Sequence, residues 1–225
     1  MIMSTFNPRP HLRRGLYLVM TEPRDGYERL CEYSVEADIA AVQLRIKKHD
    51  IQEREHLALA RRLRSLTKGS STLFIVNDWP EIAIESDADG LHIGQQDMQP
   101  TEARRLIGPD KLLGLSTHNL EQVKKANGTP VDYIGFGPLY LTTSKVRPDP
   151  VVGPETLKDA HRSSQNPIVA IGGLDMERIQ GLGPYAHNVA VIRAVSEAAD
   201  PLSMMRLMQE EFLKYAEPAR EGSHR

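Results

Sequence analysis

The 225-residue chain contains one cysteine, Cys31, so it can form no internal disulfide bond. Scarce cysteine is typical of proteins in a reducing compartment, and we expect a cytoplasmic location. Aromatic residues make up only 5% of the chain, and the formal net charge is −2. Because a dedicated nucleic-acid-binding protein carries a basic excess, this charge argues against a nucleic-acid partner.

Long apolar runs are also missing from the sequence. No stretch reaches the roughly 20 apolar residues of a transmembrane helix, and residues 1–14 lack the apolar stretch of a secretory signal. Residues 1–14 are rich in Pro and Arg, and we expect them to form a flexible arm, with a frayed tail at residues 217–225. Hydrophobic residues still account for 40% of the chain, enough for a sizeable core. We therefore expect one folded domain over residues 15–216 and no membrane partner.

Short apolar runs rich in β-branched residues recur along the chain, with helical patterns between them. Nearly continuous apolar character is typical of parallel strands that are buried on both faces. The expected strands are 16–20, 41–45, 73–77, 90–92, 112–116, 133–136, 168–171 and 189–192. The expected helices are 51–66, 101–107, 120–126, 154–161, 176–182 and 201–215.

The alternation of strands and helices favours a parallel sheet with helices packed on it. Eight such strands without a break in composition predict closure into a single (βα)8 TIM barrel, and 225 residues lie at the short end of the size range of that α/β fold. An open doubly wound sheet is the alternative. Its dinucleotide-binding version is disfavoured because no Gly-x-Gly-x-x-Gly follows the first expected strand.

Polar residues follow the apolar runs, at the strand ends where a βα barrel carries its active site. Gln43 and Arg45 alternate along the second expected strand, so their side chains share one face. Lys47 continues that face if the strand continues. With Lys145, which follows the sixth expected strand, these residues can form a positive wall that holds a diphosphate. A solvated Lys/Arg turn is the alternative interpretation.

Asp78 and Asp97 follow the third and fourth expected strands. Two carboxylates at the ends of neighbouring strands can bind one hard cation such as Mg²⁺ and leave it open to phosphate oxygens. Helix capping is the competing interpretation, because Pro80 and Pro100 follow closely and proline favours the first helical position. We prefer metal binding because both aspartates belong to the same layer as the cationic residues.

Gly172-Gly173 and the end of the eighth expected strand predict a phosphate-binding turn. Glycine lets backbone N–H groups approach an anion, although turns also use Gly-Gly freely. His118 ends the fifth expected strand, where it can act as an acid or base or make a structural hydrogen bond. His92 lies inside a strand and is expected to support its neighbours.

These motifs resemble, in their order along the chain, those of the thiamine-phosphate synthase family. The resemblance runs from about residue 15 to residue 195. Its segments are Gln43-Leu44-Arg45-Ile46-Lys47, Asn77-Asp78, His92-Ile93-Gly94-Gln95-Gln96-Asp97, Ser116-Thr117-His118, Gly135-Phe136-Gly137-Pro138, Thr142-Thr143-Ser144-Lys145 and Ala170-Ile171-Gly172-Gly173. The resemblance implies a Mg²⁺-dependent transferase of thiamine biosynthesis. Such an enzyme couples hydroxymethylpyrimidine diphosphate to thiazole phosphate and releases diphosphate.

The resemblance also implies a role for each matched residue. Asp78 and Asp97 would hold Mg²⁺. The residues implied to contact the pyrimidine diphosphate are Gln43, Arg45, Lys47, Asn77, Ser116 and Lys145, with Arg45, Lys47 and Lys145 as the catalytic cations. The residues implied to surround the thiazole phosphate are Thr142, Ser144, Gly173, Ile192 and Arg193.

Four positions depart from the family pattern. Ile46 stands where Glu is usual, Trp79 where Arg is common, and Ser144 where Thr is usual. Arg193 stands where Ser is usual in the phosphate-binding turn, and its guanidinium can either contact the phosphate or crowd it.

Two other functions remain open. One is a thiazole tautomerase that uses His118 as a proton shuttle, and the other is a non-catalytic thiamine-phosphate-binding protein. Retention of Asp78, Asp97 and the cationic residues favours the synthase, because an isomerase has no diphosphate to hold. The expected partners are small phosphorylated substrates. The sequence leaves the oligomeric state open, a homodimer included.

Overall fold

The computed structural model describes residues 10–46, 52–142 and 149–215. Its eight strands are all parallel and close into one barrel in the order β1-β2-β3-β4-β5-β6-β7-β8, which confirms the predicted (βα)8 fold. The strands are β1 (Gly15–Met20), β2 (Ala41–Leu44), β3 (Leu73–Asn77), β4 (Gly90–Ile93), β5 (Leu112–Thr117), β6 (Tyr133–Phe136), β7 (Ile168–Ile171) and β8 (Asn188–Val191).

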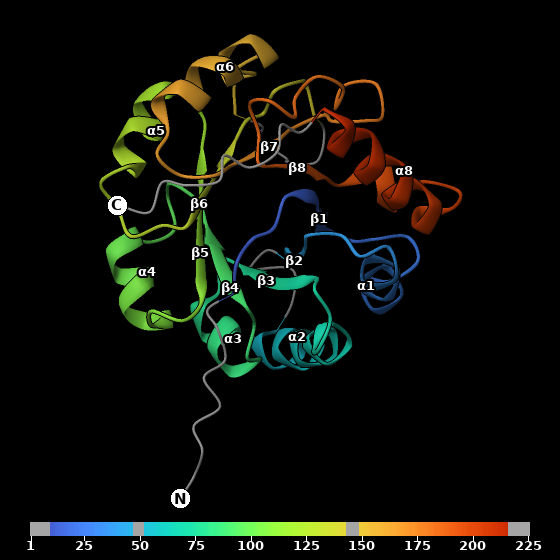
Figure 1. Ribbon diagram of the computed structural model, residues 1–225. Helices are drawn as coiled ribbons and strands as arrows, with labels where there is room; N and C mark the ends of the chain where they lie inside the picture. The colour runs from blue at the N-terminus through green and yellow to red at the C-terminus, as the bar shows by residue number, and fades with distance from the viewer. Residues whose placement is uncertain (1–9, 47–51, 143–148, 216–225) are drawn as a thin grey trace, which may run out of the picture.

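Helices surround the barrel on its outside (Figure 1). They are α1 (Tyr27–Glu36), α2 (Glu53–Thr67), α3 (Pro80–Glu85), α4 (Pro100–Ile107), α5 (Leu120–Ala126), α6 (Pro154–Ser163), α7 (Arg193–Ser196) and α8 (Pro201–Lys214). Their apolar faces bury a continuous layer of side chains against the outer face of the strands, Leu18, Leu44 and Phe136 among them. No helix in the described ranges is both long enough and apolar enough to cross a membrane.

The helix predicted over residues 176–182 is wrong, because this segment forms a series of turns between β7 and β8. The Asp175 carboxylate accepts hydrogen bonds from the backbone N–H groups of Glu177 and Arg178, which starts the segment like a helix. Most of the following backbone bonds then span three residues rather than four, and Gly181 has a φ of 73°. A left-handed glycine ends a helix, so the segment never reaches a second helical turn.

The barrel interior is divided into an apolar lower part and a polar upper part. Leu12 and the inward side chains of Tyr17, Ile75, Leu112 and Val169 form a second apolar cluster, separate from the outer layer. Toward the carboxyl ends of the strands the inward residues become polar, including Gln43, Asn77, His92 and Ser116. Because successive strand residues alternate between faces, the same strands supply both the outer core and this polar interior.

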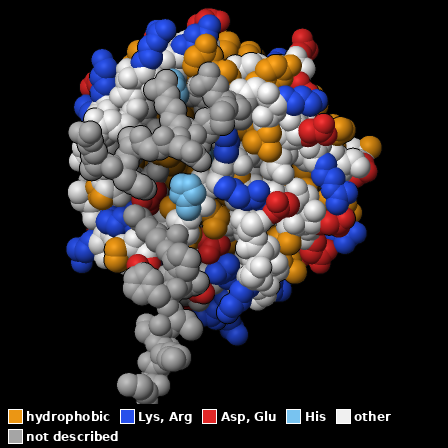
Figure 2. Space-filling view, viewed as in Figure 1, with side chains coloured by type: hydrophobic (Ala, Val, Ile, Leu, Met, Phe, Trp, Pro, Cys, Tyr) orange, Lys and Arg blue, Asp and Glu red, His pale blue; other side chains and the backbone are white. Residues whose placement is uncertain are grey.

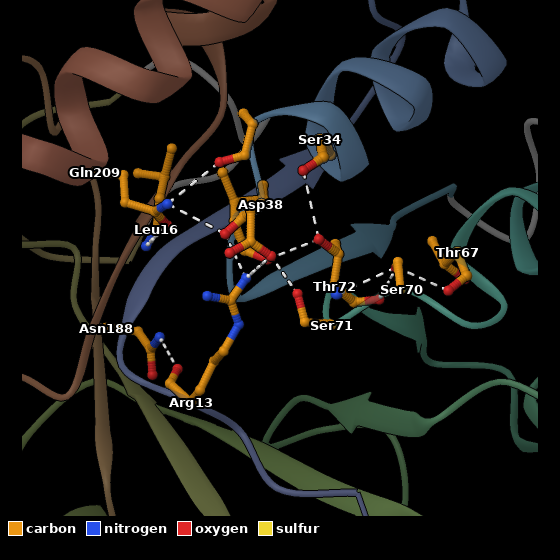
Figure 3. A network of polar contacts seen from close by, with 12 residues as sticks. Arg13, Leu16, Ser34, Asp38, Thr67, Ser70, Ser71, Thr72, Asn188 and Gln209 are labelled. Atoms are coloured by element: carbon orange, nitrogen blue, oxygen red, sulfur yellow. Dashed lines mark hydrogen bonds and ion pairs between the residues drawn. The ribbon is translucent and has the colours of Figure 1, made fainter.

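Polar contacts close the barrel at the amino ends of the strands (Figure 3). The Arg13 guanidinium lies 2.8 Å from an Asp38 carboxylate oxygen and donates to the Ile39 carbonyl at 2.8 Å. Asn188 Nδ2 donates to the Arg13 and Gly15 carbonyls at 2.9 and 3.0 Å, across the seam between β1 and β8. Contacts at this end of a βα barrel stabilise the fold, whereas the opposite end carries the chemistry.

His56 is buried on α2 without a hydrogen-bond partner for either ring nitrogen among the described residues. Its ring packs edge-on against Trp79, with 5.1 Å between the ring centroids. Burial disfavours the charged imidazolium and lowers the pKa of His56 from 6.5 to about 4. The folded protein therefore keeps this histidine neutral at pH values where the unfolded chain is protonated.

This difference predicts a pH-dependent stability. Between pH 6.5 and about 4 the unfolded chain binds a proton at His56 that the folded chain does not bind, so stability is lost as the pH falls through this window. The loss amounts to roughly 3 kcal/mol. Denaturant unfolding of the wild type and His56→Leu across this pH range should show a shallower pH dependence in the variant. The exposed His161→Leu variant should keep the wild-type dependence, and an unchanged slope in His56→Leu would contradict the prediction.

Candidate active site

A cavity of about 360 Å³ opens at the carboxyl ends of the strands, and every strand contributes to its lining. It brings together most of the residues predicted to bind substrate. Those that line it are Gln43, Arg45, Asn77, Ser116, Thr142, Gly173, Ile192 and Arg193. Lys47, Ser144 and Lys145 lie outside the described residues. Figure 2 shows acidic and basic side chains interspersed over one face of the molecule, in keeping with the net charge of −2.

Arg45 brings a partly buried positive charge to the cavity. It directly follows β2, and its backbone N–H donates to the Met20 carbonyl, so the chain leaves the barrel in a fixed direction. Its Nη1 atom is enclosed, yet no described residue accepts a hydrogen bond from it. An enclosed guanidinium N–H without an acceptor is costly. An anionic oxygen is a strong acceptor for a guanidinium N–H.

Asp78 and Asp97 lie on the same rim of the barrel, beside the carboxyl end of β4. The backbone N–H of Asp78 donates to the His92 carbonyl at 2.9 Å, and the Gly94 N–H donates to Asp97 Oδ2 at 2.6 Å. Neither aspartate caps a helix. Trp79 and Gln99 occupy the N-cap positions of α3 and α4, without a side-chain capping bond.

Two further observations bear on the aspartates. Neither contributes to the lining of the cavity itself, although His92, which contacts the Asp78 backbone, does. Asp78 has a left-handed φ of 64°. This conformation is uncommon outside glycine and is tolerated best by Asn and Asp. It turns the chain sharply at the end of β3, so that Asp78 stays near β4.

The opposite side of the cavity is built on the Gly172-Gly173 turn. Both glycines have positive φ, at 107° and 63°. A side chain at either position would collide with Pro138 or with the Leu141 carbonyl, because the loop after β6 crosses directly over the turn. The N–H of Tyr140 donates to the Gly172 carbonyl at 3.0 Å and fixes that crossing.

Two arginines stand near this turn. Arg178 donates to the Gly173 carbonyl at 2.7 Å, and its guanidinium lies 4.9 Å from the centre of the Tyr140 ring. Arg178 was not predicted as a site residue, because it lies in the segment expected to be an ordinary helix. Arg193 begins α7 and is half exposed, with Nε 3.9 Å from Glu197 Oε1. Both arginines line the cavity together with their acidic partners, Asp175 at 3.5 Å from Arg178 and Glu197 at 3.9 Å from Arg193, so this side carries paired charges of both signs.

The other described departures from the family pattern lie in the outer core. Ile46 is buried in the apolar layer between strands and helices, and Trp79 packs against the same layer beside His56. Neither side chain lines the cavity. Of the four departures, Ser144 lies outside the described residues, and Arg193 alone is placed to affect a ligand directly.

His118 is held by one ring nitrogen and faces a carboxylate with the other. Nδ1 lies 2.7 Å from the Gly137 carbonyl, and because a carbonyl only accepts, Nδ1 carries the proton in the neutral ring. Nε2 is 3.5 Å from Asp149 Oδ2. Both side chains line the cavity. His118 thus makes a structural hydrogen bond and also retains a nitrogen able to exchange a proton.

Sequence reasoning missed two tyrosines that line the lower part of the cavity, Tyr17 and Tyr133. Their hydroxyls are 3.0 Å apart, and the Tyr133 hydroxyl lies 3.2 Å from His92 Nδ1. His92 Nε2 in turn lies 2.9 Å from Ser116 Oγ, which confirms the supporting role expected for His92. Both tyrosines lie inside apolar strands, where a buried hydroxyl needs a polar partner. This position in the sequence could have identified them as members of a polar site.

Gly114 makes room for this arrangement. In the strand register it pairs with His92 on one side and with Tyr133 on the other, and a Cβ at this position would overlap both rings. Gly114→Ala should therefore lower the free energy of unfolding by about 1–3 kcal/mol, because the core must shift to fit the methyl group. Gly128→Ala meets no close neighbour and serves as the control in denaturant unfolding. Equal stability of the two variants would show that the barrel absorbs the methyl group without strain.

Comparisons with known proteins show the family of the chain. A family profile described as thiamine monophosphate synthase matches residues 16–195. A thiamine-phosphate synthase from Vibrio campbellii is 38% identical over 189 residues, covering 83% of this chain and 92% of the relative. One from Synechocystis is 39% identical over 188 residues, covering 83% of this chain but only 54% of that longer relative.

One solved structure supports the same family and another supports the fold. A thiamine phosphate pyrophosphorylase from Pyrococcus furiosus superposes with a TM-score of 0.81 at 29% identity, covering 91% of this chain and 96% of its own. An orotidine 5'-phosphate decarboxylase from Pyrococcus horikoshii, at 13% identity and a TM-score of 0.63, shares the fold alone. The family profile spans more than half of the chain, and the Vibrio relative is similar over almost its whole length. The chain belongs to the thiamine monophosphate synthase family.

Proposed function

We propose that this chain is a thiamine-phosphate synthase, a transferase that joins hydroxymethylpyrimidine diphosphate to thiazole phosphate and releases diphosphate. The observation that carries the proposal is the enclosed Arg45 Nη1, from which no described residue accepts a hydrogen bond, in a cavity that also holds a Gly-Gly turn. A diphosphate at Arg45 and a phosphate at Gly172-Gly173 would occupy opposite sides of one cavity. The reacting carbon and nitrogen would then lie between them.

The chain's contribution to the reaction is positioning and electrostatics. The C–O bond of the pyrimidine methylene breaks with its electron pair going to diphosphate, and Arg45 stabilises the charge that develops there. The aminopyrimidine spreads the positive charge left on the methylene carbon. The thiazole nitrogen then gives its lone pair to that carbon to form the C–N bond. No strong base is required, because positioning of the two substrates and stabilisation of the leaving group supply the catalysis.

Mg²⁺ is proposed as the cofactor, held by Asp78 and Asp97. Carboxylate oxygens are the ligands that Mg²⁺ prefers, and both aspartates lie beside the end of β4 without capping a helix. The described residues contain no group of three or more His, Cys, Asp or Glu side chains placed to hold a metal. A two-carboxylate site suits Mg²⁺, which keeps its other positions for water and substrate phosphates. When bound, the ion would supply positive charge for the departing diphosphate.

The direct test is an assay with both substrates and Mg²⁺ that measures diphosphate release and thiamine phosphate formation. Stoichiometric appearance of both products, lost on addition of a chelator, is the expected result. Tight binding of the substrates without turnover would instead identify a thiamine-phosphate-binding protein.

A thiazole tautomerase remains a second candidate function because of the His118–Asp149 pair. His118 Nε2 faces a carboxylate across 3.5 Å while Nδ1 is fixed by the Gly137 carbonyl, which is an arrangement able to shuttle a proton. Solvent proton exchange into thiazole phosphate in the absence of the pyrimidine would reveal this activity. Its loss in His118→Gln, with coupling retained, would assign it to this pair.

Arg193 is expected to contribute to binding of the thiazole phosphate. Because its half-exposed guanidinium lines the cavity beside the Gly-Gly turn, Arg193→Ser should raise the KM for thiazole phosphate roughly 10-fold. The KM for the pyrimidine diphosphate should stay unchanged. Arg162→Ser, which removes an exposed arginine on α6, is the control. An unchanged KM for thiazole phosphate would mean that the Arg193 side chain does not contact this substrate.

The proposed partners are these small phosphorylated substrates, and the proposed location is the cytoplasm. The location rests on the single cysteine, Cys31, which is buried in α1. Burial raises the pKa of its thiol to about 12, so it stays protonated and unreactive.

A further inference from the structure

The Arg178 side chain joins two loops at the rim of the cavity. Its Nη1 atom donates to the Gly173 carbonyl at 2.7 Å, and its guanidinium carbon lies 4.9 Å from the centre of the Tyr140 ring. Gly173 belongs to the loop after β7, whereas Tyr140 belongs to the loop after β6, which leads on to Thr142. Arg178 therefore ties the Gly-Gly turn to the loop that crosses over it.

Asp175 holds both the backbone and the side chain of Arg178. One carboxylate oxygen of Asp175 accepts the Arg178 backbone N–H at 2.9 Å, and the other lies 3.5 Å from Arg178 Nε. A free arginine side chain samples many rotamers, and simultaneous contacts with a carboxylate, a carbonyl and a ring select one of them. Because the side chain is still 45% exposed, these contacts order Arg178 without making it part of the core.

The anchored carbonyls set the direction of two backbone N–H groups in the turn. In a trans peptide the C=O and the N–H point in opposite directions. The Gly172 carbonyl accepts from the Tyr140 N–H at 3.0 Å, which fixes the Gly173 N–H, and the Gly173 carbonyl accepts from Arg178, which fixes the Leu174 N–H. No described residue accepts a hydrogen bond from either N–H group. Since Gly173 and Leu174 both line the cavity, these two donors are available to a ligand.

We propose that Arg178 is a positioning residue, which holds the Gly173–Leu174 peptide so that its N–H is directed at a phosphate oxygen before the ligand arrives. The inference rests on the proposed function and adds a residue to it, since the phosphate is that of the thiazole substrate. Glycine has the widest choice of backbone conformations, so without Arg178 the peptide after Gly173 would have to be ordered on binding, at a cost in affinity. The guanidinium also polarises this peptide and strengthens the Leu174 N–H as a donor.

The first test is a titration with inorganic phosphate, followed by the NMR amide signals of Gly173 and Leu174. Both signals should shift in the wild type, and Arg178→Met should weaken phosphate binding roughly 10-fold without changing the free energy of unfolding, because the side chain is exposed. Arg162→Met is the matched control, since Arg162 also pairs on the surface with an aspartate three residues earlier, Asp159, at 3.3 Å. Unshifted signals in the wild type, or wild-type affinity in Arg178→Met, would overturn the proposal.

Two further variants separate positioning from a direct charge contact with the phosphate. Lysine keeps the charge but cannot donate to the Gly173 carbonyl while lying flat on the Tyr140 ring, so Arg178→Lys should lose most of the affinity that Arg178→Met loses. Tyr140→Leu removes the ring and keeps the backbone bond to Gly172. It should weaken phosphate binding roughly 3-fold, and should add nothing in the Arg178→Met background. Full affinity in Arg178→Lys, or multiplying effects in the double variant, would refute the positioning role.

Coupling kinetics distinguish failure of this inference from failure of the proposed function. Arg178→Met should raise the KM for thiazole phosphate and leave the KM for the pyrimidine diphosphate unchanged. Wild-type kinetics in Arg178→Met would refute the positioning role alone and leave the coupling activity standing. Arg178-dependent phosphate binding at Gly173 and Leu174, in a protein that never releases diphosphate, would support the positioning role and refute the coupling activity.

Discussion

Replacing Arg45 with methionine is expected to lower kcat/KM for coupling by roughly 10³-fold while leaving the protein as stable as the wild type or more stable. The loss of activity and the retained or increased stability have the same cause, which is the enclosed Nη1 atom of Arg45. The enclosed Nη1 atom has no acceptor among the described residues, so the folded protein holds a desolvated donor that water would satisfy in the unfolded chain. Methionine keeps most of the apolar length of the side chain and removes that cost.

Thermal or denaturant unfolding and steady-state kinetics, measured on the same preparations, would test this pair of effects. The free energy of unfolding should be unchanged or higher by about 1 kcal/mol. Arg105→Met, an exposed arginine on α4, is the control and should keep full activity. A large loss of stability in Arg45→Met would mean that the guanidinium supports the fold, and the loss of activity would then say nothing about diphosphate binding.

The barrel could be predicted from the sequence because its strands are buried on both faces. Such strands read as short apolar runs, and the eight predicted runs match the eight strands to within a residue at each end. The helix at residues 176–182 could not be excluded in this way. What ends it is the geometry of the Asp175 turn and of Gly181, and composition does not reveal backbone geometry.

The upper layer of the site was predictable for a similar reason, since polar residues after apolar runs must gather where parallel strands end. The lower layer of the site could not be predicted from the sequence. The contacts that join Tyr133 to His92 and His92 to Ser116 depend on the register between strands β4, β5 and β6. This register pairs His92 with Gly114, and Gly114 with Tyr133. Each residue looks ordinary in its own strand. Gly114 makes room for the rings of His92 and Tyr133, and this role follows only from the pairing of the three strands.

Arg178 and Asp149 were missed because they belong to loops, whose contacts do not follow from strand order. Arg178 reaches the site through a bond to the Gly173 carbonyl, and Asp149 reaches it by facing His118. Their side chains line the same cavity as residues predicted from the strand ends. Prediction from the strand ends therefore finds the part of a barrel site that the scaffold positions, and misses the part that the loops position.

The second large effect is expected from the two aspartates. Asp97→Asn should lower kcat/KM for coupling roughly 10²–10³-fold and raise the Mg²⁺ concentration needed for half-maximal rate. The substitution separates charge from structure, since the Asn side-chain oxygen can still accept the hydrogen bond from the Gly94 N–H. Asp78→Asn is equally conservative, because Asn tolerates the left-handed φ of 64° at this position. Either variant removes one negative charge and leaves the loop in place.

Asp87→Asn is the matched control for both variants. It also has a left-handed φ, of 57°, but precedes β4 and so lies at the opposite end of the barrel from the site. Diphosphate release measured against Mg²⁺ concentration should shift for Asp78→Asn and Asp97→Asn and stay unchanged for Asp87→Asn. If the aspartates share one ion, the double variant should lose little more activity than the worse single variant, because an ion already lost cannot be lost twice. Multiplying losses would show that the two carboxylates act separately, and a shared metal site would then be excluded.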